Sequence, residues 1–130
     1  MKEAYPIILT QEKNWYLVYV PDFEINTQGE SLAEAMEMAR DAISLTGNVL
    51  EDDGREVPKP SALYAVKKER ETDLVTLVDV DFDEYRKAND MRTVRRNVSL
   101  PQWLNVRAEK SGINVSAVLQ KALKAELNIV

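Results

Sequence analysis

Three side chains near the carboxyl end of the chain have the types needed to contact the edges of nucleic-acid bases. Arg95, Asn97 and Ser99 share one face if residues 93–99 form a strand, because successive side chains of a strand point to opposite faces. Arginine can bond guanine O6 and N7, asparagine can bond adenine N6 and N7, and serine can serve a base edge or a phosphate. A solvated strand face has the same composition, so the assignment depends on the elements around it.

A second candidate site stands at the predicted start of the last helix, at Asn114, Val115 and Ser116. Asparagine is among the preferred N-cap residues, because its side-chain oxygen accepts a backbone N–H of the first turn. The other free N–H groups and the positive end of the helix dipole favour a phosphate group. Capping does not exclude such a contact, so we expect these three residues to contact the phosphate backbone.

Carboxylates are the main remaining candidates for catalysis, because the chain has no histidine and no cysteine. This composition excludes Ser-His-Asp and thiol catalysis and every Cys/His zinc site. Asp22, Glu24 and the acidic run 51–53 are the residue types with which a two-metal nuclease holds Mg²⁺. Their spacing defines no ligand set, and a solvated face or a surface for a basic partner has the same composition. We therefore expect no catalytic residue, no metal and no cofactor.

The formal charge of −5 is divided unevenly along the chain. Residues 1–91 contain 10 Lys and Arg against 20 Asp and Glu, a charge of −10, whereas residues 92–130 contain 7 against 2, a charge of +5. An acidic body followed by a basic tail is typical of a protein with two partners of opposite charge. The tail is suited to a polyanion and the body to a basic partner.

The sequence has no feature typical of membrane insertion or export. No apolar run approaches the roughly 20 residues of a membrane-spanning helix. Residues 1–10 lack the basic start and the long apolar centre of a signal peptide. We expect a cytoplasmic protein without a membrane partner.

A small sheet and a long helix are predicted to position the acidic residues. Residues 5–10 and 15–20 are rich in β-branched and aromatic residues and flank a polar stretch, which predicts an antiparallel hairpin. Ser31 and Glu34 form a capping box at the head of a helix that should lie across the sheet and end near Gly54. The predicted sheet-facing stripe is Leu32, Ala35, Met36, Ala39, Ala42, Ile43 and Leu50, and Glu34, Glu37, Asp41 and Ser44 are predicted to lie off it.

The rest of the acidic body is predicted to return to extended structure before a second helix. The two prolines of segment 57–61 predict a stiff extended connector. Strands are expected at 62–67 and at 74–80, followed by a short helix at 82–88. The polar segment 89–92 has the composition of a linker.

The basic tail is predicted to form one strand and two helices. Residues 93–99 alternate as a strand, Pro101 opens a helix that ends at Gly112, and Asn114 opens the last helix. A lone strand lacks a hydrogen-bonding partner, so this strand must pair with its counterpart in a second copy of the chain. The sequence therefore predicts a homodimer through strand 93–99, and it is compatible with a tetramer of two such dimers.

Two resemblances to known families follow from these patterns. The C-terminal pattern resembles the ribbon-helix-helix DNA-binding family. It consists of the predicted strand, Leu100-Pro101, a helix, the segment Gly112-Ile113-Asn114-Val115-Ser116 and a second helix. Four further segments resemble the HicB antitoxin family and follow one another in the order that family uses. They are Val20-Pro21-Asp22-Phe23, Thr27-Gln28-Gly29-Glu30-Ser31, Glu34-Ala35 and Val57-Pro58-Lys59-Pro60-Ser61. The common HicB form has Pro-Gly where Glu24-Ile25 stands here, which leaves the local loop shape open.

The resemblance implies an α+β fold. A small antiparallel sheet packed on a long helix, similar to a partial ribonuclease H fold, would span 1–88. A linker at 89–92 would join it to a ribbon-helix-helix module at 93–130 for DNA binding and dimerisation. The implied function is that of a type II antitoxin, which is not an enzyme, masks a HicA-type mRNA-cleaving toxin and represses its own operon by binding operator DNA.

The residues that would contact the toxin are not specified by the resemblance. Tyr16, Asp22, Phe23 and Glu24 are candidates on the acidic body, and Trp15 is a further aromatic one. Each aromatic residue is equally suited to a place in the core. Two other functions stay open: a ribbon-helix-helix regulator whose acidic domain senses a ligand and has no toxin partner, and a metal-dependent nuclease built on the carboxylates.

Overall fold

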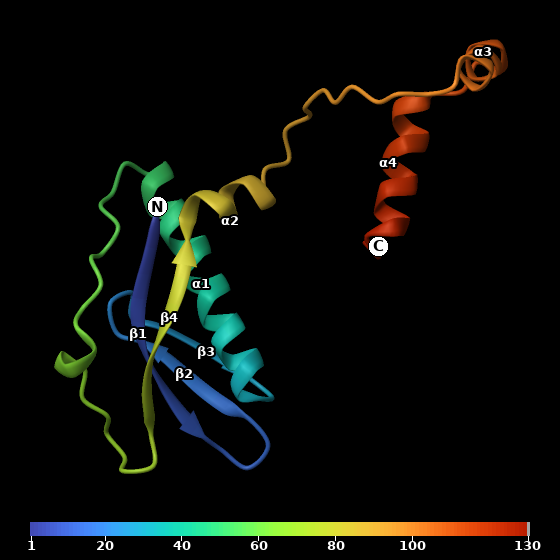
Figure 1. Ribbon diagram of the computed structural model, residues 1–130. Coiled ribbons are helices and arrows are strands. Elements are labelled where there is room, and N and C mark those ends of the chain that lie inside the picture. The colour runs from blue at the N-terminus through green and yellow to red at the C-terminus, as the bar shows by residue number, and fades with distance from the viewer. Residues whose placement is uncertain (130) are drawn as a thin grey trace. The chain divides into compact units, whose positions relative to one another are not determined.

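The computed structural model describes residues 1–129, and the chain divides into two compact units, Met1–Met91 and Arg92–Val130. Each unit is described by itself (Figure 1). The N-terminal unit consists of β1 (Lys2–Gln11), β2 (Tyr16–Val20), β3 (Ile25–Gly29), α1 (Leu32–Asp52), the 3₁₀ turn η1 (Leu63–Ala65), β4 (Leu74–Asp81) and α2 (Phe82–Ala88). The C-terminal unit contains α3 (Gln102–Ser111) and α4 (Val115–Glu126).

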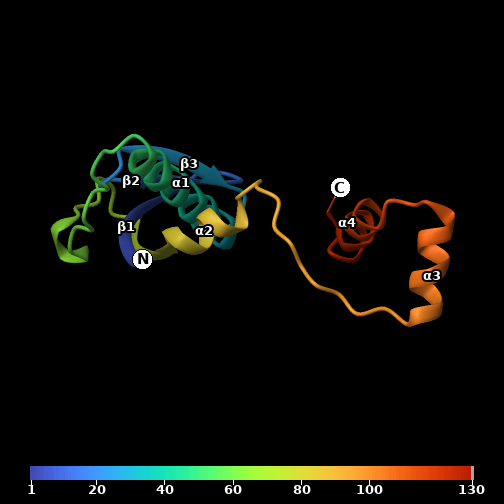
Figure 2. The same cartoon turned by 90° about the horizontal axis from the view of Figure 1, so that it is seen from above.

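The sheet of the N-terminal unit is antiparallel throughout, with the strand order β3-β2-β1-β4. Its register places Tyr5 opposite Val78, and Ile8 opposite both Tyr19 and Val75. Because side chains alternate along a strand, one face carries Tyr5 and its apolar neighbours, and the other carries Ile8 and Tyr19. Helix α1 covers the first of these faces (Figures 1 and 2).

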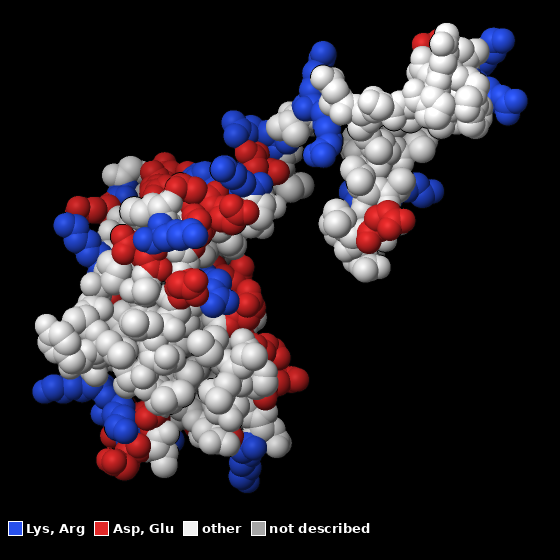
Figure 3. All heavy atoms as spheres, viewed as in Figure 1, with Lys and Arg blue, Asp and Glu red and all other residues white. Residues whose placement is uncertain are grey.

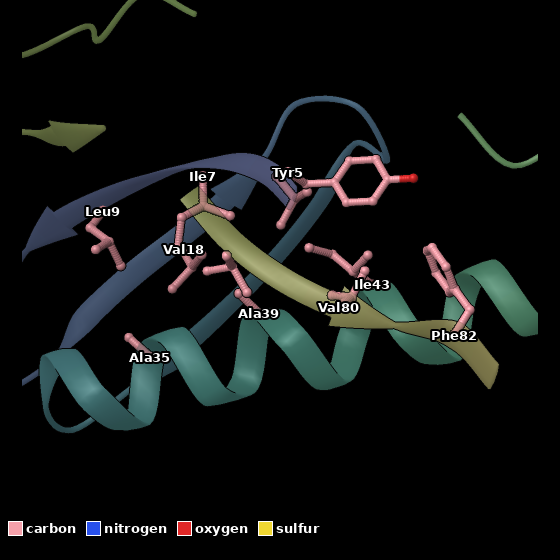
Figure 4. Close-up of a cluster of buried hydrophobic side chains, with 11 residues drawn as sticks. Tyr5, Ile7, Leu9, Val18, Ala35, Ala39, Ile43, Val80 and Phe82 are labelled. Carbon is pink, nitrogen blue, oxygen red and sulfur yellow. The ribbon is translucent and has the colours of Figure 1, made fainter. Parts of the chain in front are cut away.

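The core lies between the sheet and α1 (Figure 4). On the helix side Ala35, Ala39 and Ile43 are fully buried, and the small side chains let the helix approach the strands closely. At the far end, the rings of Tyr5 and Phe82 meet edge to face at 6.2 Å between centroids. Burying one large apolar side chain contributes roughly 1.5–3 kcal/mol, so this cluster dominates the stability of the unit. The remaining core residues are Ile7, Leu9, Val18, Val20, Val78 and Val80.

The predicted start and end of the long helix are confirmed. Ser31 is the N-cap of α1, and its hydroxyl accepts the N–H of Glu34 at 3.1 Å. Gly54 follows the helix with φ of +70°, the left-handed conformation that glycine adopts without strain. The predicted stripe is wrong at Leu32, which is 42 % exposed, and α1 also buries Ser44, which lies off the stripe as predicted. Its hydroxyl donates to the carbonyl oxygen of Arg40 at 2.7 Å, which satisfies the buried polar group.

Two segments of the N-terminal unit differ from the sequence prediction. The strand predicted at 62–67 is wrong, because this stretch is irregular apart from η1. Strand β4 has a free edge in this order, but segment 62–67 lies over the open face of the sheet, opposite Ile8 and Tyr19, instead of pairing at that edge. Strand β3 was not predicted, since its sequence Asn26-Thr27-Gln28 has little β-propensity and its pairing with β2 maintains it. The predicted strand at 74–80 and helix at 82–88 are confirmed.

The two helices of the C-terminal unit are also confirmed, with Gly112 ending α3 at φ of +71°. Residues 93–99 have no regular secondary structure in the single chain. The strand predicted there requires a second copy, so it stays a prediction. Within residues 1–129, no helix is long and apolar enough to cross a membrane.

Candidate partner and nucleic-acid interfaces

The three candidate base-reading residues lie on an exposed, extended stretch of the C-terminal unit. Arg95, Asn97 and Ser99 are exposed, and they alternate with Val94, Arg96 and Val98. Val94 is 83 % exposed, an extreme value for a β-branched apolar side chain. The stretch therefore has a polar set at one set of alternate positions and two valines flanking Arg96 at the other, and the valines are exposed in the single chain.

The helices of the C-terminal unit have no core of their own. None of the described residues of α3 or α4 is buried, and Trp103 is 60 % exposed. The guanidinium of Arg107 lies 5.5 Å from the centroid of the Trp103 ring, and both residues are exposed. An isolated pair of short helices with this exposure gains little from the hydrophobic effect. The apolar side chains left uncovered are Val98, Leu100, Leu104, Val106, Ile113, Val115, Val118, Leu123, Leu127 and Ile129.

Asn114 is the N-cap of α4, as predicted from the sequence. Its side-chain oxygen accepts the N–H of Ala117 at 3.1 Å. This bond uses one of the free N–H groups at the start of the helix. Val115 and Ser116 occupy the first turn, where backbone N–H groups point away from the helix body and towards a possible anion.

Of the four candidate toxin-contacting residues, the two aromatic ones pack against the core. Tyr16 and Phe23 are partly buried there, and the ring of Phe23 meets that of Tyr5 at 4.9 Å with an interplanar angle of 68°. Glu24 is exposed and has φ of +53° in the turn after β2. The Tyr5 hydroxyl donates to the Pro58 carbonyl at 2.7 Å, and burial, with the charges of Glu3 and Asp22, raises the pKa of Tyr5 to about 12.

Asp22, the fourth candidate, holds a segment of the chain over the open face of the sheet. Its Oδ2 accepts the N–H of Ser61 at 2.9 Å, and its Oδ1 accepts the Ser61 hydroxyl. We call residues 61–73 the strap. Figures 1 and 2 show the strap and α1 on opposite sides of the sheet. The carboxylate of Asp22 thus has a structural task that sequence reasoning did not assign to it.

Asp73 holds the other end of the strap. Its Oδ1 accepts the Thr10 hydroxyl at 2.9 Å, and its Oδ2 accepts the N–H of Arg70 at 3.1 Å. The side chain is only 7 % exposed. Burial acts to raise the pKa of Asp73, but the hydrogen bonds from Arg70 and Thr10 outweigh it and hold the pKa below its usual value.

A groove lies between the strap and the open face of the sheet. Its volume is about 560 Å³. The sheet side is lined by Ile8, Thr10 and Tyr19, and the strap side by Ala65, Val66 and Lys67. Sequence reasoning missed this groove, although Asp22 and Ser61, which maintain it, both belong to the segments that carry the HicB resemblance.

Three of the carboxylates considered for metal binding, Asp22, Glu51 and Asp52, are engaged in other interactions. Arg86 donates from Nη1 to Asp52 at 2.9 Å and from Nη2 to Glu51 at 3.2 Å. Asp22 is bonded to Ser61. Among the residues that the structure describes, no group of three or more Asp, Glu, His or Cys side chains could hold a metal ion.

Comparison with known families covers both units. The family model for HicB-like antitoxins of bacterial toxin-antitoxin systems matches residues 5–122. A curated relative, described as an uncharacterized 14.9 kDa protein from Haemophilus phage HP1, is 38 % identical over 80 residues. That match covers 59 % of this chain and 60 % of the relative.

Solved structures show the same fold. The chain is similar to one in a toxin-antitoxin complex from Streptococcus pneumoniae, with a TM-score of 0.60, 24 % identity, and coverage of 97 % of this chain and 99 % of that one. It is also similar to the antitoxin HicB of Burkholderia pseudomallei, with a TM-score of 0.55, 25 % identity and 96 % of each chain covered.

Proposed function

Because the chain belongs to the HicB-like antitoxin family, we propose that it neutralises a HicA-type, mRNA-cleaving toxin and represses its own operon. The N-terminal unit binds and masks the toxin. The C-terminal unit dimerises as a ribbon-helix-helix module and binds operator DNA. The observation that carries the proposal is the match to residues 5–122, which spans both units. In this function the protein is not an enzyme and uses no cofactor.

Dimerisation of the C-terminal unit follows from what the single chain leaves uncovered. Two copies of 93–99 paired as antiparallel strands satisfy each other's backbone groups. The pairing places Val94, Arg96 and Val98 on one face, where the apolar sides of α3 and α4 from both copies cover the two valines. Arg95, Asn97 and Ser99 then form the opposite face, with three side chains from each copy.

That polar face is suited to the major groove of DNA. A two-stranded ribbon fits the groove, and Arg95 and Asn97 have the donors and acceptors to read guanine and adenine. Asn114, Val115 and Ser116 at the start of α4 hold a phosphate on the backbone beside it. The charge of +5 on residues 92–130 favours the polyanion.

The toxin-masking role rests on the N-terminal unit. It is a complete domain with its own core, and residues 1–91 have a charge of −10. The electric field of this negative charge speeds the encounter with a basic protein, whereas buried apolar contacts supply most of the affinity of the complex once it has formed.

Co-expression with the toxin gene that the proposal predicts beside this one, a small, basic reading frame, tests the neutralising role. The wild-type chain should relieve the growth arrest caused by that frame. The double variant Arg95→Ala/Asn97→Ala should relieve the arrest equally well, but it should no longer repress a reporter driven by the operon's promoter. Growth arrest that persists with the wild-type chain would remove the neutralising role.

Sedimentation tests the dimer. The wild-type chain should sediment as a dimer or a multiple of one, and the charge placed by Val98→Asp in the shared apolar layer should shift it towards monomer. Asn97→Asp adds the same charge on the polar face and should leave the mass unchanged. A monomeric wild-type chain at micromolar concentration contradicts the ribbon.

The groove under the strap favours one second candidate function. Its volume is in the range of small-molecule sites, which fits a regulator whose N-terminal unit senses a ligand instead of a toxin. Operator affinity that responds to a small metabolite, together with growth arrest that the chain fails to relieve, would select this alternative.

A further inference from the structure

Helix α1 has a second apolar stripe on the side that faces away from the sheet. Met38, Ala42, Leu45 and Val49 follow one another at spacings of four, three and four residues. This is the spacing of a helix seam that packs against another helix. Met38, Leu45 and Val49 are 41 %, 51 % and 48 % exposed, and Ala42 is partly buried. We call these four residues the outer seam.

Acidic side chains flank the outer seam. Glu34, Asp41 and Asp52 are separated by seven and eleven residues, so they lie in line along one side of it. Figure 3 shows Asp and Glu along the α1 side of the N-terminal unit. Arg86 pairs with Asp52, whereas Arg40 donates to Asp79 and Glu37, which leaves Glu34 and Asp41 as the border carboxylates without an ion pair to these two arginines. The seam is therefore an apolar centre with an acidic border.

Three contacts hold α1 firmly in place beneath the seam. At its start, a Cβ on Gly29 would lie 2.4 Å from the backbone nitrogen of Ala35, so β3 and the helix touch directly. Near its end, Gly47 packs in the same way against Phe82. In the last turn, Arg86 donates to the carbonyl of Asn48 at 3.3 Å and to two carboxylates of α1. A surface that is already rigid loses little entropy when a partner binds.

The strap is the competing surface on this unit. Tyr64 on η1 is 92 % exposed, and an exposed tyrosine is common at protein interfaces. The charges around it are mixed, however, because Lys67, Lys68 and Arg70 alternate with acidic residues. The strap therefore shows no preference for a basic partner, whereas the outer seam does.

We propose that the outer seam is the surface that binds the toxin, and that its occupant is an amphipathic helix with an apolar stripe and Lys or Arg along one edge. The inference rests on the proposed neutralising function and adds the surface and the chemistry of the partner. The toxin helix packs its apolar stripe on Met38, Leu45 and Val49. Its basic edge lies beside Glu34 and Asp41, since Asp52 is already paired with Arg86.

Binding of full-length variants to the purified product of the adjacent reading frame, measured by calorimetry, tests the surface. Leu45→Glu places a charge at the centre of the seam and should weaken binding by about 100-fold or more, as expected for a central interface residue. Tyr64→Glu introduces the same charge on the strap and should bind within about threefold of wild type. Both positions are at least half exposed, so both variants should retain the wild-type unfolding temperature and operator affinity.

Asp41→Lys tests separately whether the acidic border attracts the toxin, and the quantity measured is the rate at which the two proteins associate. The rate should fall several-fold at low ionic strength, and the difference should vanish in high salt, because steering by exposed charges is screened. Lys67→Glu on the strap is the matched reversal and should leave the rate unchanged or raise it slightly.

Three results would overturn the assignment. The first is wild-type affinity of the Leu45→Glu variant for the toxin, and the second is loss of binding in Tyr64→Glu alone. The third is a change in the mass of the free antitoxin in Leu45→Glu, which would make the seam a contact between copies of this chain. Binding by the wild-type chain tests the proposed function by itself. If the wild-type chain and the Leu45→Glu variant bind the toxin equally well, the outer seam is not the binding surface, but the proposed neutralising role is unaffected.

Discussion

Gly47 of α1 lies directly against the ring of Phe82, the first residue of α2. A Cβ built on Gly47 would be 2.2 Å from Cε1 and 2.7 Å from Cδ1 of that ring. The ring is 1 % exposed and also meets Tyr5 of β1, so it has little room to move. The absence of a side chain at position 47 thus lets α1, α2 and β1 meet at one point.

Replacement of Gly47 by alanine should destabilise the N-terminal unit. In an exposed helix the change would stabilise by about 1 kcal/mol, because glycine is a poor helix former. Here the added methyl group must displace a buried ring, which should reverse the sign and cost about 1–3 kcal/mol. Urea unfolding followed by circular dichroism measures the difference. Thr46→Ala, one position earlier, is the control and should be close to neutral; a stabilised Gly47→Ala variant would contradict the contact.

Asp22→Asn should loosen the strap, because the carboxylate of Asp22 has a structural role and no catalytic one. The amide keeps one acceptor oxygen for Ser61 but loses the charge that strengthens both bonds, at a cost of about 1–2 kcal/mol. Amide hydrogen exchange should accelerate at Ser61 and along the strap. Ser61→Ala removes only the hydroxyl bond and should have a smaller effect in the same direction. Mg²⁺-dependent RNA cleavage by the wild-type protein that is lost in Asp22→Asn would instead indicate a catalytic carboxylate.

The attachment of the strap at Asp73 should depend on pH. The pKa of Asp73 is below its ordinary value of 3.8 in the folded chain, so its contribution to stability is present above that pH and is lost as the pH falls through the folded pKa. The unfolding temperature of Asp73→Asn should be lower than that of wild type at pH 7. The gap should begin to narrow near pH 3.8, and it should close once the pH is below the lowered pKa of Asp73, where the wild-type carboxylate is protonated as well. A gap that stays constant down to pH 2 would show that the charge of Asp73 contributes nothing.

Two basic residues of the C-terminal unit should affect DNA binding in different ways. Arg95→Ala should cost about 1–3 kcal/mol at one base position and relax specificity there, because it removes a contact to a base edge. Lys110→Ala should weaken binding to all sequences alike if this side chain reaches a phosphate. Titration of the promoter fragment and of single-base variants separates the two, and affinity for the wild type should fall steeply with salt. Unchanged base preference in Arg95→Ala would reject the groove-facing assignment.

Local signals in the sequence were sufficient for most of the helices and for the hairpin. Ser31 and Asn114 predicted helix starts because a capping side chain bonds N–H groups only three residues away. Gly54 and Gly112 predicted helix ends because a positive φ is easy only for glycine. Each of these features depends on neighbours in the sequence. The charge division at residue 92 was visible in the same way, and it coincides with the division between the two units.

Other features were decided by residues far apart in the sequence. The polar residues of β3 form a strand because β2 offers an unpaired edge. Segment 62–67 forms none because the bonds of Ser61 to Asp22 and of Thr10 to Asp73 hold it over the face of the sheet and not at the free edge of β4. Ser44 is buried because α2 extends the covered side of α1 beyond the stripe that faces the sheet. Asp22 maintains the strap because Ser61, 39 residues later, comes within hydrogen-bonding distance. The sequence by itself determined where most elements begin and end, since short-range hydrogen bonds and backbone preferences set those limits. Only the tertiary structure decided which side chains each element covers and which it leaves for a partner, because burial depends on what packs against it.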